Sequence, residues 1–121
     1  MEHLEKLFGS GAGQALIDDM EGLCPDFAEM SIEWALGGIS ARPGLDITRE
    51  LVVIASCVTL GHTVTQLRAH TQAALSAGAK RDQIIETILQ LTFYAGGAAV
   101  RNALVHVKDI LADAAEADAA D

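Results

Sequence analysis

Apolar residues recur along most of this chain at the three- and four-residue spacing of amphipathic α-helices, and no segment shows the strict alternation of a β-strand. The stretch 51–58 is apolar nearly all round and predicts a buried central helix. Asp46 or Thr48 can cap the start of this helix, and Gly61 ends it. A strand of the same composition is the alternative, but the length and the flanking cap and glycine favour the helix. The sequence therefore predicts an all-α fold.

Turn residues divide the rest of the chain into further helices. The glycine-rich segment 9–13 is typical of a flexible connector, and Pro25 suits the first turn of a helix. Glycines at 37–38 are expected to end that helix, and Thr63 with Gln66 has the spacing of a capping box. The expected helices span about 1–8, 25–36, 48–60, 63–77, 81–96 and 98–115.

The chain length of 121 residues predicts a single domain, a bundle of about six helices. We divide it into an N-terminal helix with a flexible glycine-rich connector (1–24), a helical domain (25–112) and an acidic Ala/Asp tail (113–121). The tail is expected to be a solvated, fraying helix end.

Composition limits the partners that the protein can have. Half of the residues are hydrophobic, which is more apolar surface than one small globule hides, so we expect a homo-oligomer. A net charge of −9 disfavours nucleic acid and anionic membranes as partners. Cys24 and Cys57 form no CxxC, and no segment has the apolar length of a membrane span. We therefore expect a reduced, cytoplasmic protein without a membrane partner.

Glu50 and His70 are the candidate catalytic residues. Glu50 lies in the first turn of the central helix, where the helix dipole supports a negative charge and a carboxyl group can act as acid or base. His70 shares a helix face with Leu67 and Ala74, so it is expected to point inward, where an imidazole can shuttle a proton. The structural alternatives are a helix-start carboxylate paired with Arg49 or with a neighbouring subunit, and a satisfied core or interface histidine.

Substrate-binding candidates lie nearby in the sequence. His62 sits at the mouth between the two helices, where a donor can meet a ligand, although it can equally be a loop histidine. If the ligand is an organic acid, one of Arg42, Arg49 and Arg68, and above all Arg42 or Arg49, is expected to hold its carboxylate, with a surface position or a salt bridge as the alternative for each. His62 and His70 lack the i, i+4 spacing of two ligands on one helix face, so we expect no metal and no cofactor.

Several ordered motifs between about Pro25 and Leu111 resemble the carboxymuconolactone decarboxylase family, whose members share an alkylhydroperoxidase-D-like all-α fold. The resemblance implies assembly into trimers or hexamers, with a pocket near the subunit interfaces. The motifs are Arg42-Pro43-Gly44-Leu45-Asp46, Thr48-Arg49-Glu50-Leu51, Leu60-Gly61, Gln66-Leu67-Arg68-Ala69-His70, Ala73-Ala74-Leu75-Ser76-Ala77-Gly78, Ile85-Glu86, Tyr94-Ala95-Gly96 and Asn102-Ala103-Leu104.

The resemblance also bears on the chemistry. The redox branch of the family carries CxxC where this chain has His62-Thr63-Val64-Thr65, so disulfide-based peroxide reduction is disfavoured. Glu50 and His70 match the acidic residue and the histidine of the family's proton-handling set, with a one-residue offset in the preceding loop. Gly97-Ala98 departs from the x-Pro that follows Tyr-Ala-Gly in the family.

These observations lead to the expectation of a cofactor-free carbon–carbon lyase that decarboxylates a small carboxylated lactone or related organic acid by general acid/base chemistry. A related proton-transfer, ring-opening or cyclising enzyme on another carbonyl compound is the first alternative. A non-catalytic oligomer that binds a small acid is the second, and the altered Gly97-Ala98 segment motivates it.

Overall fold

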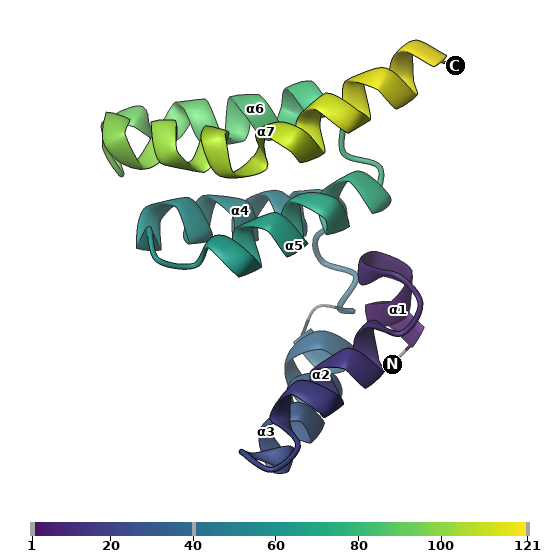
Figure 1. Ribbon diagram of the computed structural model, residues 1–121. Coiled ribbons are helices and arrows are strands. Elements are labelled where there is room, and N and C mark those ends of the chain that lie inside the picture. The colour runs from purple at the N-terminus through teal and green to yellow at the C-terminus, as the bar shows by residue number, and fades with distance from the viewer. Residues whose placement is uncertain (1, 40, 121) are drawn as a thin grey trace. The chain divides into compact units, whose positions relative to one another are not determined.

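The structure is a computed structural model that describes residues 2–39 and 41–120, and over these residues it contains helices and turns but no strand (Figure 1). The all-α prediction is therefore confirmed, with seven α-helices where the sequence suggested about six in all. In chain order the elements are α1 (Glu2–Phe8), α2 (Ala12–Met20), α3 (Pro25–Met30), the π-helical η1 (Ser31–Ile39), α4 (Thr48–Leu60), α5 (Val64–Ser76), α6 (Arg81–Leu89), the 3₁₀-helical η2 (Gln90–Phe93) and α7 (Gly97–Ala120).

Contacts divide the chain into two compact units, Met1–Asp46 and Ile47–Asp121. The boundary that the sequence suggested at 24/25 falls inside the first unit, and the one at 112/113 falls inside α7. Across the described residues, no helix combines the length and the apolar character that crossing a membrane requires.

The first unit contains a helix that the sequence analysis missed. We expected a flexible connector through residue 24, but α2 occupies Ala12–Met20. Its start is held by the Glu5 carboxylate, which accepts hydrogen bonds from the backbone N–H groups of Gly11 and Gly13, the latter at 3.1 Å. Because the first N–H groups of a helix have no partner within it, this distant cap stabilises a helix that follows a glycine-rich turn.

The next helix in this unit begins as expected and ends later. Cys24 is the N-cap and Pro25 the first helical residue of α3. The predicted end at the glycine pair 37–38 is wrong, because η1 carries the helical path to Ile39. A Cβ atom at Gly38 would lie 3.3 Å from the carbonyl oxygen of Glu33, so the absence of a side chain there relieves crowding in this wider turn.

The second unit packs four helices in two layers (Figure 1). One layer is the antiparallel pair α4 and α5, and the other is the antiparallel pair α6 and α7. Isoleucine, leucine, valine and alanine side chains from all four helices meet between the layers. Burial of such side chains from water is the main force that holds the unit together. Its buried cluster consists of Ile54, Cys57, Val58, Leu67, Ala74, Ala79, Ile84, Ile88, Val100, Ala103, Val107 and Leu111.

The turn between α4 and α5 only partly follows the prediction. Gly61 ends α4 with φ of 80°, a left-handed conformation that glycine adopts without steric cost. Thr63 is the N-cap of α5, but its hydroxyl does not cap the helix as expected. It donates instead to the carbonyl oxygen of Cys57 at 3.1 Å, which ties the turn back onto the end of α4.

The last two helices also have ends that differ from the expectation. α6 stops at Leu89 and continues as η2, so the predicted helix to residue 96 is shorter. α7 runs from Gly97 to Ala120 and includes most of the segment that we expected to fray. Its alanines have the highest intrinsic helix propensity, and they keep this acidic segment helical.

Candidate functional site

The structure brings Glu50 and His70 together. Oε2 of Glu50 lies 2.6 Å from Nδ1 of His70, so the first turn of α4 is linked directly to the middle of α5. Glu50 is 3% exposed, whereas the His70 side chain keeps 20% of its surface accessible. This arrangement confirms the inward direction expected for His70, and it shows that Glu50 is buried as well.

The Glu50 carboxylate and the His70 imidazole differ in their hydrogen-bonding role and in their burial. An ionised carboxylate only accepts hydrogen bonds, so the Nδ1–H of His70 donates to Glu50 when Glu50 is ionised. That hydrogen bond selects one imidazole tautomer and orients the ring. The carboxylate is buried and the imidazole is more accessible. This is the arrangement of sites in which a carboxylate orients a histidine that transfers the proton.

The structure places His62 away from this pair. His62 follows the C-terminal end of α4, whereas Glu50 lies in the first turn of that helix. The ten residue steps from Glu50 to Leu60, the last residue of α4, span about 15 Å along the helix axis at a rise of 1.5 Å per residue. The ring is exposed, and its Nδ1 lies 3.1 Å from the carbonyl oxygen of Leu60. A binding role for His62 stays a prediction.

Two of the candidate arginines, Arg49 and Arg42, lie in different parts of the chain. Arg49 immediately precedes Glu50 in α4 and is half-buried, with its Nε atom out of contact with solvent. Arg42 belongs to the first unit, where its backbone N–H donates to Ile39 in the turn that follows η1. Neither binding role is tested by this geometry, and both stay predictions.

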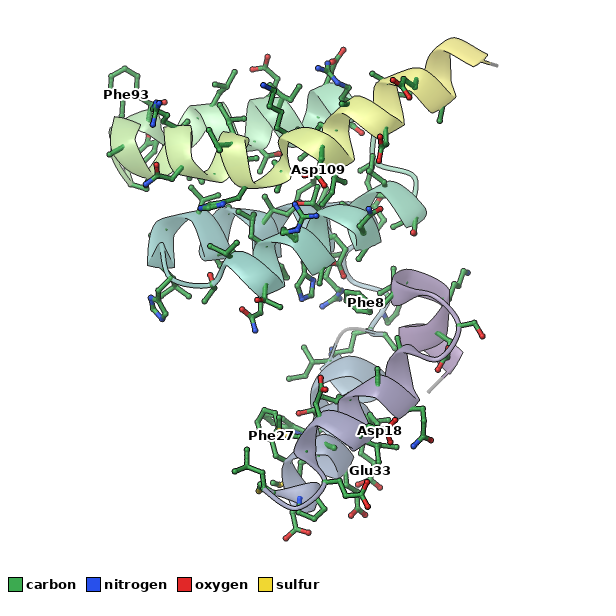
Figure 2. The ribbon with its side chains drawn as sticks, in the orientation of Figure 1. Phe8, Asp18, Phe27, Glu33, Phe93 and Asp109 are labelled. Atoms are coloured by element: carbon green, nitrogen blue, oxygen red, sulfur yellow. The ribbon has the colours of Figure 1, made fainter. Side chains whose placement is uncertain are left out.

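Arg68, the third candidate arginine, forms an ion pair whose partner the sequence did not predict. Arg68 of α5 makes a two-pronged contact with Asp109 of α7, with N–O distances of 2.8 and 2.9 Å, and also donates to the carbonyl oxygen of His106. Asp109 is labelled on α7 in Figure 2. The hydrogen bond from Arg68 lowers the pKa of Asp109 to about 2, and the same contact raises the pKa of Arg68. No local pattern signals this pair, because its members lie 41 positions apart.

Because the pKa of Asp109 is lowered in the folded protein, the stability that this carboxylate contributes should depend on pH. A carboxyl group with a depressed pKa in the folded state contributes stability above its unfolded value, near 3.8, and loses it as the pH falls towards 2. Asp109→Asn should therefore lower the free energy of unfolding slightly at pH 7, since both side chains are largely exposed, and less at pH 3. Urea unfolding at both values measures this, with Asp113→Asn as control; an equal effect at both pH values would contradict it.

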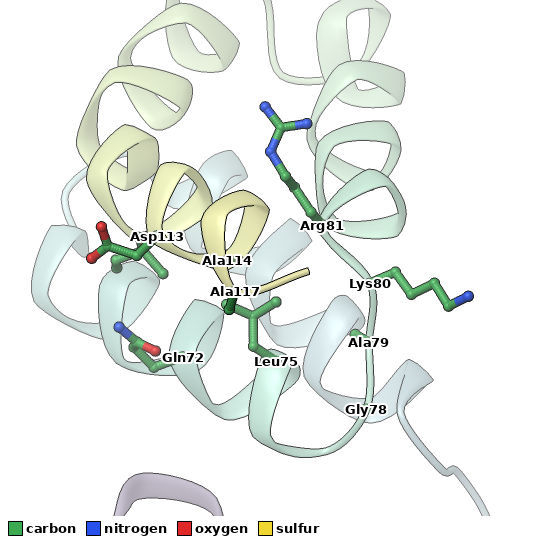
Figure 3. Close-up of a pocket in the computed structure, with 10 residues that line it drawn as sticks. Gln72, Leu75, Gly78, Ala79, Lys80, Arg81, Asp113, Ala114 and Ala117 are labelled. Carbon is green, nitrogen blue, oxygen red and sulfur yellow. The ribbon is translucent and has the colours of Figure 1, made fainter. Parts of the chain in front are cut away.

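An open pocket of about 580 Å³ lies where the end of α5 and the following turn meet α7 (Figure 3). Leu75, Ala114 and Ala117 form its apolar part. Lys80 points away from these side chains, and Arg81 donates from Nε to the carbonyl oxygen of Leu111 at 3.2 Å. The two cations do not converge on the pocket, so we assign no ligand to it.

Both cysteines are free thiols. Cys57 is 7% exposed within the second unit, as expected for a residue of the buried central helix, and Cys24 is exposed in the first unit. A cavity of about 20 Å³ adjoins Cys57, which is roughly the space of one water molecule. Among the described residues, no three His, Cys, Asp or Glu side chains gather as a metal site would require.

Comparison with known proteins identifies the class to which this fold and site belong. The model of the carboxymuconolactone decarboxylase family matches residues 25–109. A 4-carboxymuconolactone decarboxylase of Acinetobacter baylyi is 34% identical over 94 residues, which cover 77% of this chain and 69% of that protein. The chain therefore belongs to the carboxymuconolactone decarboxylase family.

A second relative broadens this picture without adding an activity. An uncharacterized 15.0 kDa protein encoded in the nqo9-nqo10 intergenic region of Paracoccus denitrificans is 31% identical over 96 residues. These residues cover 78% of this chain and 72% of that protein. Membership of the family thus rests on most of the chain's length.

Proposed function

We propose that this protein is a cofactor-free decarboxylase of a small carboxylated lactone or related organic acid. The observation that carries the proposal is the 2.6 Å contact between buried Glu50 and half-buried His70. The family and the name of the Acinetobacter relative support a decarboxylase. The pair supplies the group that such a reaction needs, a histidine held in one orientation for proton transfer.

In the proposed reaction, the bond between the substrate carbon and its carboxylate breaks, and carbon dioxide leaves. The electron pair of that bond moves into the unsaturated lactone and its carbonyl oxygen, forming an enolate. Protonated His70 then donates a proton from Nε2 to carbon, because Nδ1 is held by Glu50. Solvent returns the proton to the imidazole, so the net change replaces the carboxylate with hydrogen.

Glu50 has two roles in this proposal. Its carboxylate accepts the hydrogen bond from Nδ1 of His70, which makes Nε2 the ring atom that transfers the proton. It also holds the ring plane, which limits the directions from which the proton can be delivered. Arg42 or Arg49 is proposed to hold a substrate carboxylate. We further propose a cytoplasmic homo-oligomer, a trimer or hexamer.

The direct test is to incubate the purified protein with 4-carboxymuconolactone and to follow the product by mass spectrometry. The proposal predicts a product lighter by one carbon dioxide. The corresponding lactone without the carboxylate serves as control and should not be consumed. Conversion at unchanged mass would replace the proposal with an isomerase or cyclase, and tight binding of the acid without any turnover would replace it with a binding protein.

A further inference from the structure

The outer side of the α6–α7 pair carries an apolar groove that the proposed reaction does not use. Its volume is about 250 Å³, and it is lined by Arg81, Ile85, Leu104, Val105, Lys108 and Leu111. Val105 is 58% exposed, and Leu89, one turn beyond Ile85 on α6, is 41% exposed. Contiguous apolar surface of this kind marks an interaction site more often than isolated exposed residues do.

Charges of opposite sign border this groove on its two helices. On α6, exposed Glu86 lies three positions before Leu89, and exposed Asp82 lies three positions before Ile85. On α7, exposed Arg101 and Lys108 lie four positions before and three positions after Val105. Residues three and four apart share a helix face, so Asp82 and Glu86 place two carboxylates on the α6 side, where Arg81 also lines the groove, and Arg101 and Lys108 place two cations on the α7 side. Asp109, four positions after Val105, is held by Arg68 of α5. Asp82 also lies 3.5 Å from Arg81 of its own helix, which leaves Glu86 as the main acidic group.

We propose that this α6–α7 face, made of Ile85, Leu89, Leu104 and Val105 with the bordering charges, packs against the same face of a second copy of the chain. A twofold contact uses one patch twice, so the patch must be complementary to itself. Of the two assemblies proposed above, such a contact fits the hexamer and not the isolated trimer. The apolar strip is complementary to itself at its centre, because it buries itself against an identical strip. The bordering charges are complementary to themselves only for one orientation of the twofold axis.

That orientation follows from the order of the charges. A twofold axis parallel to the helices lays α6 of one copy over α7 of the other, so each acidic border meets a basic border. A twofold axis in the same plane but across the helices lays α6 over α6, and Glu86 then faces like charges. Because like charges brought together across an interface weaken association strongly, the first arrangement is selected. It pairs Glu86 of each copy with Lys108 of the other.

The first test uses two matched substitutions of exposed valines by glutamate. Val105→Glu places a charge in the α6–α7 face, and Val52→Glu places the same charge at a 55% exposed position on α4, outside this face. We expect sedimentation analysis of the full chain to show a smaller assembly for Val105→Glu than for the wild-type chain and for Val52→Glu. A monomeric wild-type chain, or a Val105→Glu variant of unchanged mass, would overturn the proposal.

The second test uses the twofold symmetry. Glu86→Lys and Lys108→Glu each place like charges across both halves of the contact, so each variant alone should self-associate about tenfold or more weakly. Mixing the two variants pairs lysine with glutamate at both places, and association should recover to near the wild-type strength. Failure of the mixture to associate better than either variant alone would exclude this pairing. The readout is mass, so it is independent of whether the chain decarboxylates anything.

Discussion

His70→Gln is expected to lower the decarboxylation rate by about 10²–10⁴-fold, the usual contribution of a positioned general acid or base. Glutamine preserves a hydrogen-bonding group near Glu50 but cannot carry the transferable proton. The Michaelis constant should change far less than kcat, because the proton is delivered in the transition state rather than in the bound complex. Initial rates of carbon dioxide release at several substrate concentrations measure both.

The matched control for this variant is His106→Gln. His106 is exposed on α7, and it is the backbone carbonyl of this residue, not its side chain, that accepts from Arg68. Its replacement should leave kcat within about twofold of the wild-type value, since surface changes away from a site have small effects. Comparable losses in both histidine variants, or an undiminished rate in His70→Gln, would remove His70 from the mechanism.

Ile54→Ala is expected to lower the free energy of unfolding by about 2–5 kcal/mol. Ile54 has no exposed surface and belongs to the cluster between the two helical layers. Its truncation removes buried methyl and methylene groups and leaves a cavity that the surrounding helices fill only in part. Urea unfolding followed by far-ultraviolet circular dichroism gives the change.

Val52→Ala is the control for that prediction. Val52 lies on the same helix two positions earlier, but its side chain is 55% exposed. The expected change is within about 0.5 kcal/mol, because few contacts are lost and alanine has the higher helix propensity. Equal destabilisation by both substitutions would show that α4 does not present its faces to core and solvent as described.

The helix positions of Glu50 and His70 could be predicted because they depend on local rules. Helical periodicity put His70 on the same face as Leu67 and Ala74, and both of these are fully or almost fully buried. Glu50 follows a turn and opens an apolar helix, so its place in the first turn was clear from the sequence. What periodicity could not supply is the distance between the two groups, which depends on how α4 and α5 pack.

Other features were missed because they depend on contacts between distant positions. The start of α2 is capped by Glu5, six and eight positions before the glycines that it binds, outside the spacing of a standard capping box. The Arg68–Asp109 pair joins helices far apart in the chain. Thr63 has a capping-box sequence, yet its hydroxyl finds the Cys57 carbonyl, because the tight turn after α4 brings that acceptor closer.

The proposal that Glu50 and His70 act as one proton-handling unit is tested most directly by a double-mutant cycle on kcat/KM. Glu50→Gln, His70→Gln and the double variant are compared with the wild-type chain in the decarboxylation assay, after circular dichroism shows that each is folded. If Glu50 acts only through His70, the double variant should be no slower than His70→Gln alone, within about threefold. Losses that multiply in the double variant, or full activity in both single variants, would contradict the account.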